Sequence, residues 1–416
     1  MNPKTIMRSI SPLAVVALAL AVAACGSNSV SPGREQGSGT ISIGIITPTS
    51  GADAILGKYV VDGATIAVDQ INHSGGVGGK KLKLVVEDEK LDPVQSVKDM
   101  RDLNAQGINV VYGFASSADC LAAQPVAKQL DMVYLGSCND NSLVSTKFDP
   151  HFFQVAASLD SLTNAASAFI KSDYRDVKNW DMYSLDYVTG HSQVDAFKTS
   201  LAKAVPGVQL GKETYAPLDA TDVRSYVGSI KNAAGPAKAD GLYVFAYGAA
   251  DIAFLKQAAQ ADVYPGYAEV VNVAGDVVSD EGVGAQLQPT WNVYDYFYKA
   301  YDNPLNQAFA AAFAKTYKSE PVAWSAQADI AMTSIAQALK KTGGSSSANK
   351  MISALEGLSF DSIKGQVTFR PSDHVLEQSV VAYHCQGDAK SSTGIACNHW
   401  QVIPASEVLP PSQVQR

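Results

Sequence analysis

Residues 41–46 read ISIGII, residues 59–72 read YVVDGATIAVDQIN, and residues 81–87 read KLKLVVE. The first run is rich in β-branched residues and is typical of a strand, whereas the second repeats its apolar residues at helical spacing. Gly75-Gly76 follows the helical stretch, and the third run again has the character of a strand. This order predicts the start of a βαβ series.

The same alternation continues along the first part of the chain. We expect a helix at Pro93–Ala105, a strand at Val110–Phe114, a helix at Ala118–Leu130 and a strand at Met132–Leu135. Because strands and helices alternate, the sheet that they form is predicted to be parallel.

A second series of the same kind follows. Helices are expected at Ser161–Ser172, Ser192–Ala202, Val223–Ala233 and Ala250–Ala259, and strands at Trp180–Ser184, Val208–Tyr215, Gly241–Ala246 and Glu269–Val273. Further elements are expected after these two series: helices at Asn306–Tyr317 and Ala326–Lys341, and strand-like runs at Gln366–Phe369 and Val380–His384. We expect them to add to the two sheets that the earlier strands form. The chain is therefore predicted to form two α/β lobes with several crossovers between them, and a loose tail at Pro404–Arg416.

The first 24 residues have the features of an export signal. Lys4 and Arg8 precede an apolar run from Leu13 to Val22, which ends at Ala23-Ala24-Cys25-Gly26. Small residues directly before a cysteine are typical of a lipoprotein cleavage site, so we expect residues 1–24 to be removed, Cys25 to carry lipid and residues 25–39 to serve as a tether. The alternative is a lone cysteine within a signal segment. Lipid on Cys25 would hold the protein at the membrane, on the extracytoplasmic side.

The charge of the chain argues against nucleic acid as a partner. Loss of Lys4 and Arg8 leaves 30 basic against 40 acidic residues, a net charge of −10. Phosphate backbones and anionic membrane surfaces attract basic proteins, so neither is expected as the main partner.

Four cysteines remain once Cys25 is assigned to lipid. In an exported protein they favour two disulfides. Their order favours Cys120 with Cys138 and Cys385 with Cys397, although other pairings are formally open. His384 and His399 beside the second pair also permit a zinc site, but the spacing matches no common zinc finger.

The sequence contains no familiar catalytic motif. The glycines at 75–79 follow a helix rather than opening one, and no Ser or Thr follows the lysine as a phosphate loop requires. There is no Gly-x-Ser-x-Gly elbow and no His-Glu-x-x-His pair. We therefore expect neither an enzyme nor a cofactor or metal.

Taken in order, the motifs resemble those of the type I periplasmic solute-binding proteins of branched-chain amino acid and amide ABC transporters. The resemblance covers nearly the whole chain after the signal, and its specificity comes from the order and spacing of the pieces. These are Ile43-Gly44-Ile45 to Ser50-Gly51, Gly63-Ala64 through Ile71-Asn72, Gly75-Gly76-Val77-Gly78-Gly79, Asp88 to Pro93, Gly113 with Ser116-Ser117, Gln124-Pro125-Val126-Ala127, Asp186 to Gly190, and Phe360 through Gly365-Gln366-Val367.

The resemblance implies two Rossmann-like lobes with parallel sheets, joined by three crossovers and closing over a small-molecule ligand. We expect the N-terminal lobe at residues 40–156 and 285–342, the C-terminal lobe at 157–284 and 343–403, and the tail at 404–416. It also implies permease and ATPase subunits as partners. A monomer is the default for a clamp that must open.

Ser116 and Ser117 fall where a strand gives way to a helix, a geometry whose free N–H groups and hydroxyls suit a carboxylate. The alternative is that they only cap the helix. The resemblance implies that Ser117 holds the ligand carboxylate and that Ser137 and Asn139 add contacts. The family usually has a threonine where Asn139 stands, and a turn rich in Asn, Asp and Gly is the other interpretation. A bridge from Cys120 to Cys138 would pin these two loops together.

On the opposite lobe the resemblance implies that Tyr247 and the loop of Asp186, Tyr187 and Thr189 meet the ligand. Amino-acid binders of this family carry an acid one strand later, yet Ala274 stands at or near that place and Asp276 two residues on. If neither Asp276 nor Asp186 reaches the cleft, a buried ammonium would lack a counter-charge, and the ligand would not be an α-amino acid.

Two aromatic sources could line the cleft: the run Trp291-Asn292-Val293-Tyr294-Asp295-Tyr296-Phe297-Tyr298, and Trp324. Packing at the hinge and in the core is favoured for most of these side chains over stacking on ligand.

The function implied is capture of a small carboxylate-bearing solute, such as an amino acid, an amide, or an aromatic or aliphatic acid, for delivery to an ABC permease. Two alternatives stay open: a ligand-sensing subunit of a membrane receptor, and an exported enzyme.

Overall fold

The computed structural model describes residues 39–234 and 240–414. The predicted signal, Cys25 and most of the tether therefore lie outside the described residues. The described residues form one compact unit. No helix of the described ranges is long and apolar enough to cross a membrane.

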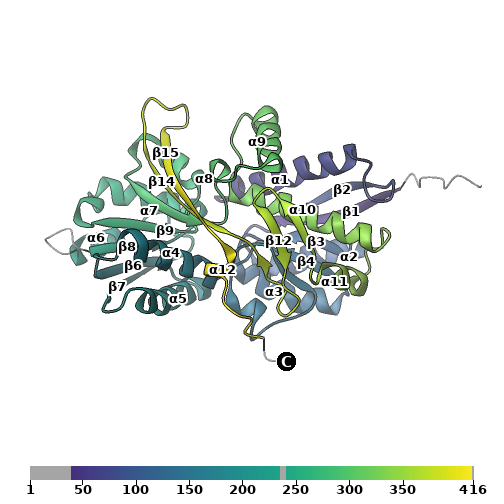
Figure 1. Ribbon diagram of the computed structural model, residues 1–416, viewed down its shortest axis with the longest axis horizontal. Helices are drawn as coiled ribbons and strands as arrows, with labels where there is room; N and C mark the ends of the chain where they lie inside the picture. The colour runs from purple at the N-terminus through teal and green to yellow at the C-terminus, as the bar shows by residue number, and fades with distance from the viewer. Residues whose placement is uncertain (1–38, 235–239, 415–416) are drawn as a thin grey trace, which may run out of the picture. The chain divides into compact units, whose positions relative to one another are not determined.

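In the described ranges the strands form three sheets (Figure 1). The first has five parallel strands in the order β2-β1-β3-β4-β5. They are β1 (Thr40–Thr47), β2 (Lys81–Asp88), β3 (Val110–Gly113), β4 (Val133–Gly136) and β5 (Phe152–Gln154). The helices that connect these strands are α1 (Ala54–His73), α2 (Pro93–Ala105) and α3 (Ser117–Gln129), and the 3-10 turn η1 (Asn141–Val144) precedes β5.

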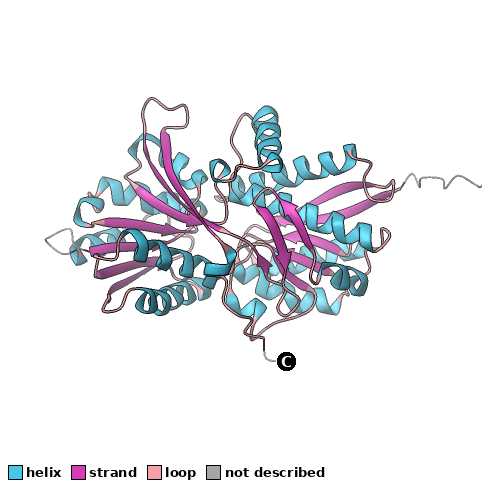
Figure 2. Cartoon of the chain, viewed as in Figure 1, coloured by secondary structure: helices cyan, strands magenta, loops and turns pink. Residues whose placement is uncertain are grey.

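The second sheet has seven strands in the order β15-β14-β10-β9-β8-β6-β7. Five are parallel: β6 (Asn179–Leu185), β7 (Gln209–Ala216), β8 (Asp240–Phe245), β9 (Glu269–Val273) and β10 (Thr290–Tyr294). The hairpin of β14 (Val380–Gly387) and β15 (Ile395–Ile403) adds antiparallel to β10. The accompanying helices are α4 (Leu159–Asp173), α5 (Val188–Ala204), α6 (Arg224–Ala233), α7 (Gly248–Gln260) and α8 (Val277–Val283), with 3-10 turns η2 (Tyr264–Gly266) and η3 (Gly284–Gln286). Figure 2 shows helices flanking the strands of both large sheets.

The chain returns to the first sheet after β10. Following the turn η4 (Tyr298–Ala300), α9 (Pro304–Tyr317) and α10 (Ala323–Lys341) pack on α1, and α11 (Ala348–Leu355) packs on α10. The α1–α10 contact is close, because a Cβ on Gly63 would lie 2.2 Å from the carbonyl oxygen of Ser325. The third sheet follows and adjoins β5 through a bridge between Gln154 and Val375. Its strands are β11 (Ser359–Ser362), β12 (Gly365–Phe369) and β13 (Leu376–Glu377).

We call the five-stranded sheet with α1–α3, α9–α11 and β11–β13 the first lobe, and the seven-stranded sheet with α4–α8 the second lobe. The chain passes between them three times, at residues 155–158, 295–303 and 378–379. The predicted fold class, two α/β lobes with parallel sheets, is confirmed.

Sheet pairing corrects the predicted assignment for part of each of two segments. Residues 285–342 were expected in the N-terminal lobe, yet β10 pairs with β9 and β14 of the second lobe. Residues 343–403 were expected in the C-terminal lobe, yet α11 packs on α10 and β13 continues the β11–β12 sheet in the first lobe. The pairing of the strands decides to which lobe a segment belongs, because hydrogen bonds between strands join segments that are far apart in the sequence. That the two lobes act as separate domains stays a proposal.

The tail is also more ordered than expected. Helix α12 (Ala405–Val408) follows β15, and Val408 is buried against the core. The carbonyl of Val408 accepts from the amide of Asn164 at 2.8 Å, and the carbonyl of Pro410 accepts from Arg370 at 2.8 Å. Through residue 414 the prediction of a loose tail is therefore wrong.

Candidate binding site

A cavity of about 20 Å³ lies where the carboxyl ends of strands from both lobes meet. The lining residues follow β3, β4, β6, β8, β9 and β10, or begin α10. Ligands of open α/β sheets bind outside the carboxyl ends of strands, so this is the expected place for a site. Its lining residues are Ala115, Ser117, Ser137, Cys138, Asn139, Tyr187, Phe245, Tyr247, Ala274, Tyr294 and Trp324.

The N-terminus of α3 forms part of the first-lobe wall. Ser116 is the N-cap residue, and its hydroxyl accepts from the backbone N–H of Ala118 at 3.2 Å. Ser117 is the first helical residue and lines the cavity. The two predicted roles are thus divided: Ser116 caps the helix, and Ser117 faces the site at the positive end of the helix dipole, where an anion is stabilised.

The loop after β4 forms the rest of this wall, with Ser137, Cys138 and Asn139. The Ser137 hydroxyl donates to the phenol oxygen of Tyr112 at 3.1 Å, and the backbone carbonyl of Asn139 accepts from the N–H of Leu159 at 2.7 Å. Ser117, Ser137 and Asn139 therefore lie on one wall of the cavity.

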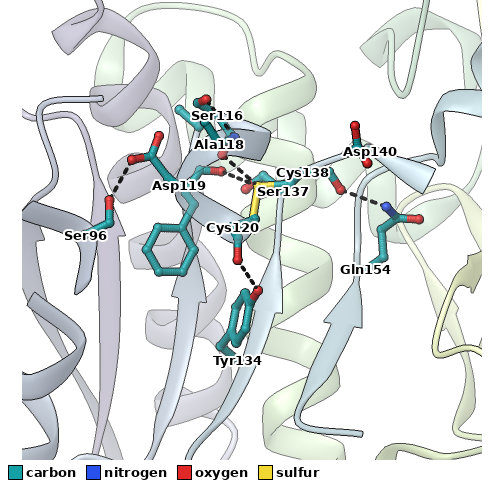
Figure 3. The surroundings of a disulfide bond; sticks show 12 residues. Ser96, Ser116, Ala118, Asp119, Cys120, Tyr134, Ser137, Cys138, Asp140 and Gln154 are labelled. Atoms are coloured by element: carbon teal, nitrogen blue, oxygen red, sulfur yellow. Dashed lines mark hydrogen bonds between the residues drawn. A yellow bond between two sulfur atoms is a disulfide. The ribbon is translucent and has the colours of Figure 1, made fainter. Parts of the chain in front are cut away.

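A disulfide joins these two parts of the wall, as Figure 3 shows. Cys120 lies in the first turns of α3 and Cys138 in the loop after β4, and both are buried. The second pair, Cys385 with Cys397, joins β14 to β15. Both predicted pairings are confirmed, and the second disulfide occupies the sulfur atoms that a zinc ion would need.

Two tyrosines close the cavity from the second lobe. Tyr187 precedes α5 and Tyr247 precedes α7, both with extended backbone, and their rings meet edge to face with centroids 6.5 Å apart. The hydroxyl of Tyr247 has no hydrogen-bond partner of good geometry among the described residues, although the hydroxyls of Tyr187 and Ser116 lie nearby. Burial raises the pKa of Tyr187 to about 12 and that of Tyr247 well above its ordinary value, so both phenols stay protonated as donors.

Aromatic side chains from β8, β10 and α10 surround the remaining space. Phe245 ends β8, Tyr294 ends β10, and the Tyr294 and Trp324 rings have centroids 6.5 Å apart. Packing roles were favoured for most of the aromatic run and for Trp324. That holds for Trp291, whose ring packs against Phe169 with centroids 4.5 Å apart, whereas Tyr294 and Trp324 line the cavity.

Four of the residues expected at the site lie outside the cavity lining, and Ser116, the cap of α3, is the first of them. Asp186 is exposed and pairs with the Nε2 atom of His191 at 2.8 Å. Thr189 is fully buried and donates to Oδ2 of Asp140 at 3.3 Å. Asp276 is buried outside the lining of the cavity.

The lining therefore contains hydroxyls, an amide and aromatic rings, but no Asp, Glu, Lys, Arg or His among the described residues. Ala274, which stands at or near the place where the resemblance implies an acid in amino-acid binders, does line it, in a left-handed conformation with φ +65°. A buried ammonium needs a compensating charge, so this lining suits a solute without an amine.

Asp276 gives a pH dependence that can be tested. Burial raises the pKa of its carboxyl to about 8, although the N–H groups of Val277 and Ala323 lower it somewhat. The unfolded chain loses this proton above about pH 4, whereas the folded protein keeps it until about pH 8. The contribution of Asp276 to the free energy of unfolding is therefore present below pH 4 and falls as the pH rises from 4 to 8.

We expect Asp276→Asn to be more stable than wild type at pH 8, by up to about 5 kcal/mol, and nearly equal to it at pH 4. Urea unfolding at a series of pH values measures this difference. Asp186→Asn, which changes an exposed carboxylate, is the control, and its stability should run parallel to wild type. A D276N curve that also runs parallel would contradict the assignment.

Comparison with known proteins shows which family has this architecture. A family model described as periplasmic binding protein matches residues 40–390. A Leu/Ile/Val-binding protein homolog 7 of Brucella abortus is 27% identical over 329 residues, which cover 73% of this chain and 76% of the relative.

Solved structures share the fold. A solute-binding protein of an ABC transporter from Rhodopseudomonas palustris BisB5, in complex with 3,4-dihydroxybenzoic acid, is 21% identical with a TM-score of 0.78, covering 88% of this chain and 98% of that one. An ABC-type branched-chain amino acid transporter protein from Rhodopseudomonas palustris CGA009 is 21% identical with a TM-score of 0.72, covering 90% and 100%. The resemblance seen in the sequence is confirmed, and the chain belongs to the periplasmic binding protein family.

Proposed function

We propose that this chain is the extracytoplasmic, lipid-anchored solute-binding protein of an ABC importer, and that its cleft captures a small aromatic carboxylate without an amino group. Membership of the periplasmic binding protein family supports the general role. The signal sequence that ends at Cys25 supports export and lipid anchoring. The observation that carries the choice of solute is the cavity lining, in which the described residues combine a helix N-terminus with aromatic rings and include no charged side chain.

The carboxylate of the solute would meet the first lobe. The N-terminus of α3 and the hydroxyl of Ser117 offer donors to an anion, and the Tyr247 hydroxyl adds another from the opposite lobe. The Ser137 hydroxyl would join them by turning its proton away from Tyr112. Bonds from donors to a charged acceptor are stronger than neutral ones, about 1.5–3 kcal/mol each. The helix dipole then supplies the positive potential that no Lys or Arg of the described lining provides.

The ring of the solute would lie among the aromatic side chains. Phe245, Tyr294 and Trp324 present faces and edges on which an aromatic solute can stack. The structural relative from Rhodopseudomonas palustris BisB5, whose printed ligand is 3,4-dihydroxybenzoic acid, supports this class of solute.

Binding requires the lobes to part. A cavity of about 20 Å³ has room for about one water molecule, so a ring cannot enter while the lobes stay as they are. We propose that solute first meets the first lobe and that closure about the three crossovers brings Tyr187 and Tyr247 over it, which hides it from water.

Thermal stabilisation of the protein begun after Cys25 tests the choice of solute. Benzoate and hydroxybenzoates, at a hundred times the dissociation constant, should add about 2.7 kcal/mol to the free energy of unfolding. Benzamide, which has the ring without the charge, and leucine, which has the carboxylate with an amine, serve as matched controls and should stabilise far less. Stabilisation by leucine but not by benzoate would refute the proposed class of solute.

Recovery of the bound solute separates a binding protein from an enzyme, and the neighbouring genes separate an importer component from a sensor. A binding protein returns benzoate unchanged, as chromatography of the released solute would show, whereas an enzyme returns product. Genes for a permease and an ATPase beside this gene would support import, and a kinase or cyclase gene there would favour a sensor.

A further inference from the structure

Asp53 lies at the start of α1, but its side chain does not cap that helix. It is the N-cap residue of α1, yet in the described residues its side chain makes no capping hydrogen bond there. Oδ1 of Asp53 instead accepts from the backbone N–H of Ala249, in the first turn of α7, at 2.9 Å. Because α1 belongs to the first lobe and α7 to the second, this carboxylate caps a helix of the opposite lobe.

The backbone of α7 is shaped for this approach. Gly248 has φ +58°, and a Cβ built on it would lie 2.1 Å from Oδ1 of Asp53. Only glycine leaves space for the carboxylate at that distance. In the described residues the side chain of Tyr247, the N-cap residue of α7, makes no capping hydrogen bond, so Asp53 supplies what the helix end lacks.

Asp140 makes a second contact of the same kind. Its Oδ1 accepts from the backbone N–H of Ser142 within the first lobe at 2.9 Å, while its Oδ2 accepts from the hydroxyl of Thr189 at 3.3 Å. Thr189 lies in the first turn of α5, in the second lobe. The two acids thus reach α5 and α7, whose N-cap residues are the cavity tyrosines Tyr187 and Tyr247.

We infer that Asp53 and Asp140 form an interlobe latch: each grips the first turn of a second-lobe helix and so positions the tyrosines that cover the solute. The inference rests on the proposed function for its purpose, but not for its geometry. Neither acid lines the cavity, so both act through α5 and α7 rather than by touching solute.

The surroundings of Asp53 allow the latch to open. Asp53 and Ala249 also line a second cavity of about 360 Å³, between residues 48–53 and 90–91 of the first lobe and residues 218–221 and 249–250 of the second. Burial between the lobes raises the pKa of the Asp53 carboxyl, although the N–H of Ala249 lowers it somewhat. Separation of the lobes would rehydrate the carboxylate while leaving the N-terminus of α7 uncapped.

Distance measurements between the lobes test the latch without any solute. Spin labels at the exposed positions Arg101 in α2 and Lys203 in α5 report the open and closed populations. We expect Asp53→Ala to lower the ratio of closed to open protein about tenfold, the effect of losing one charge-assisted bond, and Asp140→Ala to lower it less, because its interlobe bond is longer. Asp53→Asn keeps an acceptor and should fall between wild type and D53A.

The matched control is Asp92→Ala. Asp92 caps α2 within the first lobe, where its Oδ1 accepts from the N–H of Val94 at 2.9 Å, so D92A loses a helix cap without losing an interlobe bond. It should unfold more easily but keep the wild-type ratio of closed to open protein. Equal closed fractions in wild type, D53A and D140A, with or without solute, would overturn the inference.

A second variant tests the same contact from the other lobe, in case D53A does not fold. Gly248→Ala places a methyl group where the carboxylate sits, so it should lower the closed fraction in the wild-type background and much less when combined with Asp53→Ala. Benzoate release, measured by stopped flow, should be about tenfold faster in D53A. If benzoate does not bind, the proposed class of solute is refuted. The distance measurements still test the latch, because they need no solute. An effect of G248A that is the same in both backgrounds would count against it.

Discussion

Replacing Ala274 by aspartate should abolish the binding of aromatic carboxylates. Ala274 lines the cavity, and Asp there would put a second negative charge beside the carboxylate of the solute in a space closed to water. Like charges brought together at such an interface cost several kcal/mol, so we expect the dissociation constant for benzoate to rise by about a hundredfold or more. Titration calorimetry measures the change.

Ala274→Asn is the matched control for this prediction. The backbone at Ala274 has φ +65°, a conformation that Asn and Asp adopt more easily than Ala, so both variants should fold. Asn has nearly the size of Asp without its charge and should weaken benzoate binding far less. If the aspartate also supplies a counter-charge to an ammonium, A274D should gain affinity for phenylalanine. Equal losses in A274D and A274N would show that size rather than charge matters at this position.

Removing the disulfide between Cys120 and Cys138 should cost about 3 kcal/mol of stability and also weaken solute binding. The bond closes a loop of moderate length, for which the loss of chain entropy in the unfolded state predicts this magnitude. It also fixes the end of α3 that carries Ser117 to the loop that carries Ser137 and Asn139. The double variant Cys120→Ala/Cys138→Ala, studied by urea unfolding and calorimetry, measures both effects.

The other disulfide separates the two effects. Cys385 and Cys397 join β14 to β15, away from the cavity lining, with a comparable separation along the chain. Cys385→Ala/Cys397→Ala should therefore lose a similar amount of stability but keep the wild-type affinity for solute. An unchanged affinity in the C120A/C138A protein would mean that the wall of the cavity holds its shape without the bond.

Much of the fold could be predicted because the decisive patterns are local. The range expected for α2, Pro93–Ala105, and that for β9, Glu269–Val273, agree with the structure at both ends. Strand β10 was missed, because TWNVY at residues 290–294 reads as an aromatic run near a crossover. Its strand character becomes evident only from its partners, Glu269–Val273 on one side and Val380–Gly387 on the other. Pairing between distant segments leaves no local signal.

The candidate site was predicted in part for a similar reason. Parallel topology places the ends of strands together, which pointed to Ser117, and the family resemblance added Ser137 and Tyr247. Which side chain of a turn points inward depends on backbone angles that the sequence does not reveal. Asp186 turned outward to His191, and Trp324 turned inward. No motif marked Asp53, whose partner Ala249 lies 196 residues further along the chain.

The position of the cavity at the ends of strands has an evolutionary consequence. Its lining residues come from turns, strand ends and the first residues of helices, while the cores of the two lobes lie behind them. A substitution in such a turn changes what the protein recognises with little effect on the packing that keeps it folded. Selection can therefore redirect a protein of this architecture toward another solute through a few exchanges, such as one at Ala274, while the scaffold is inherited unchanged.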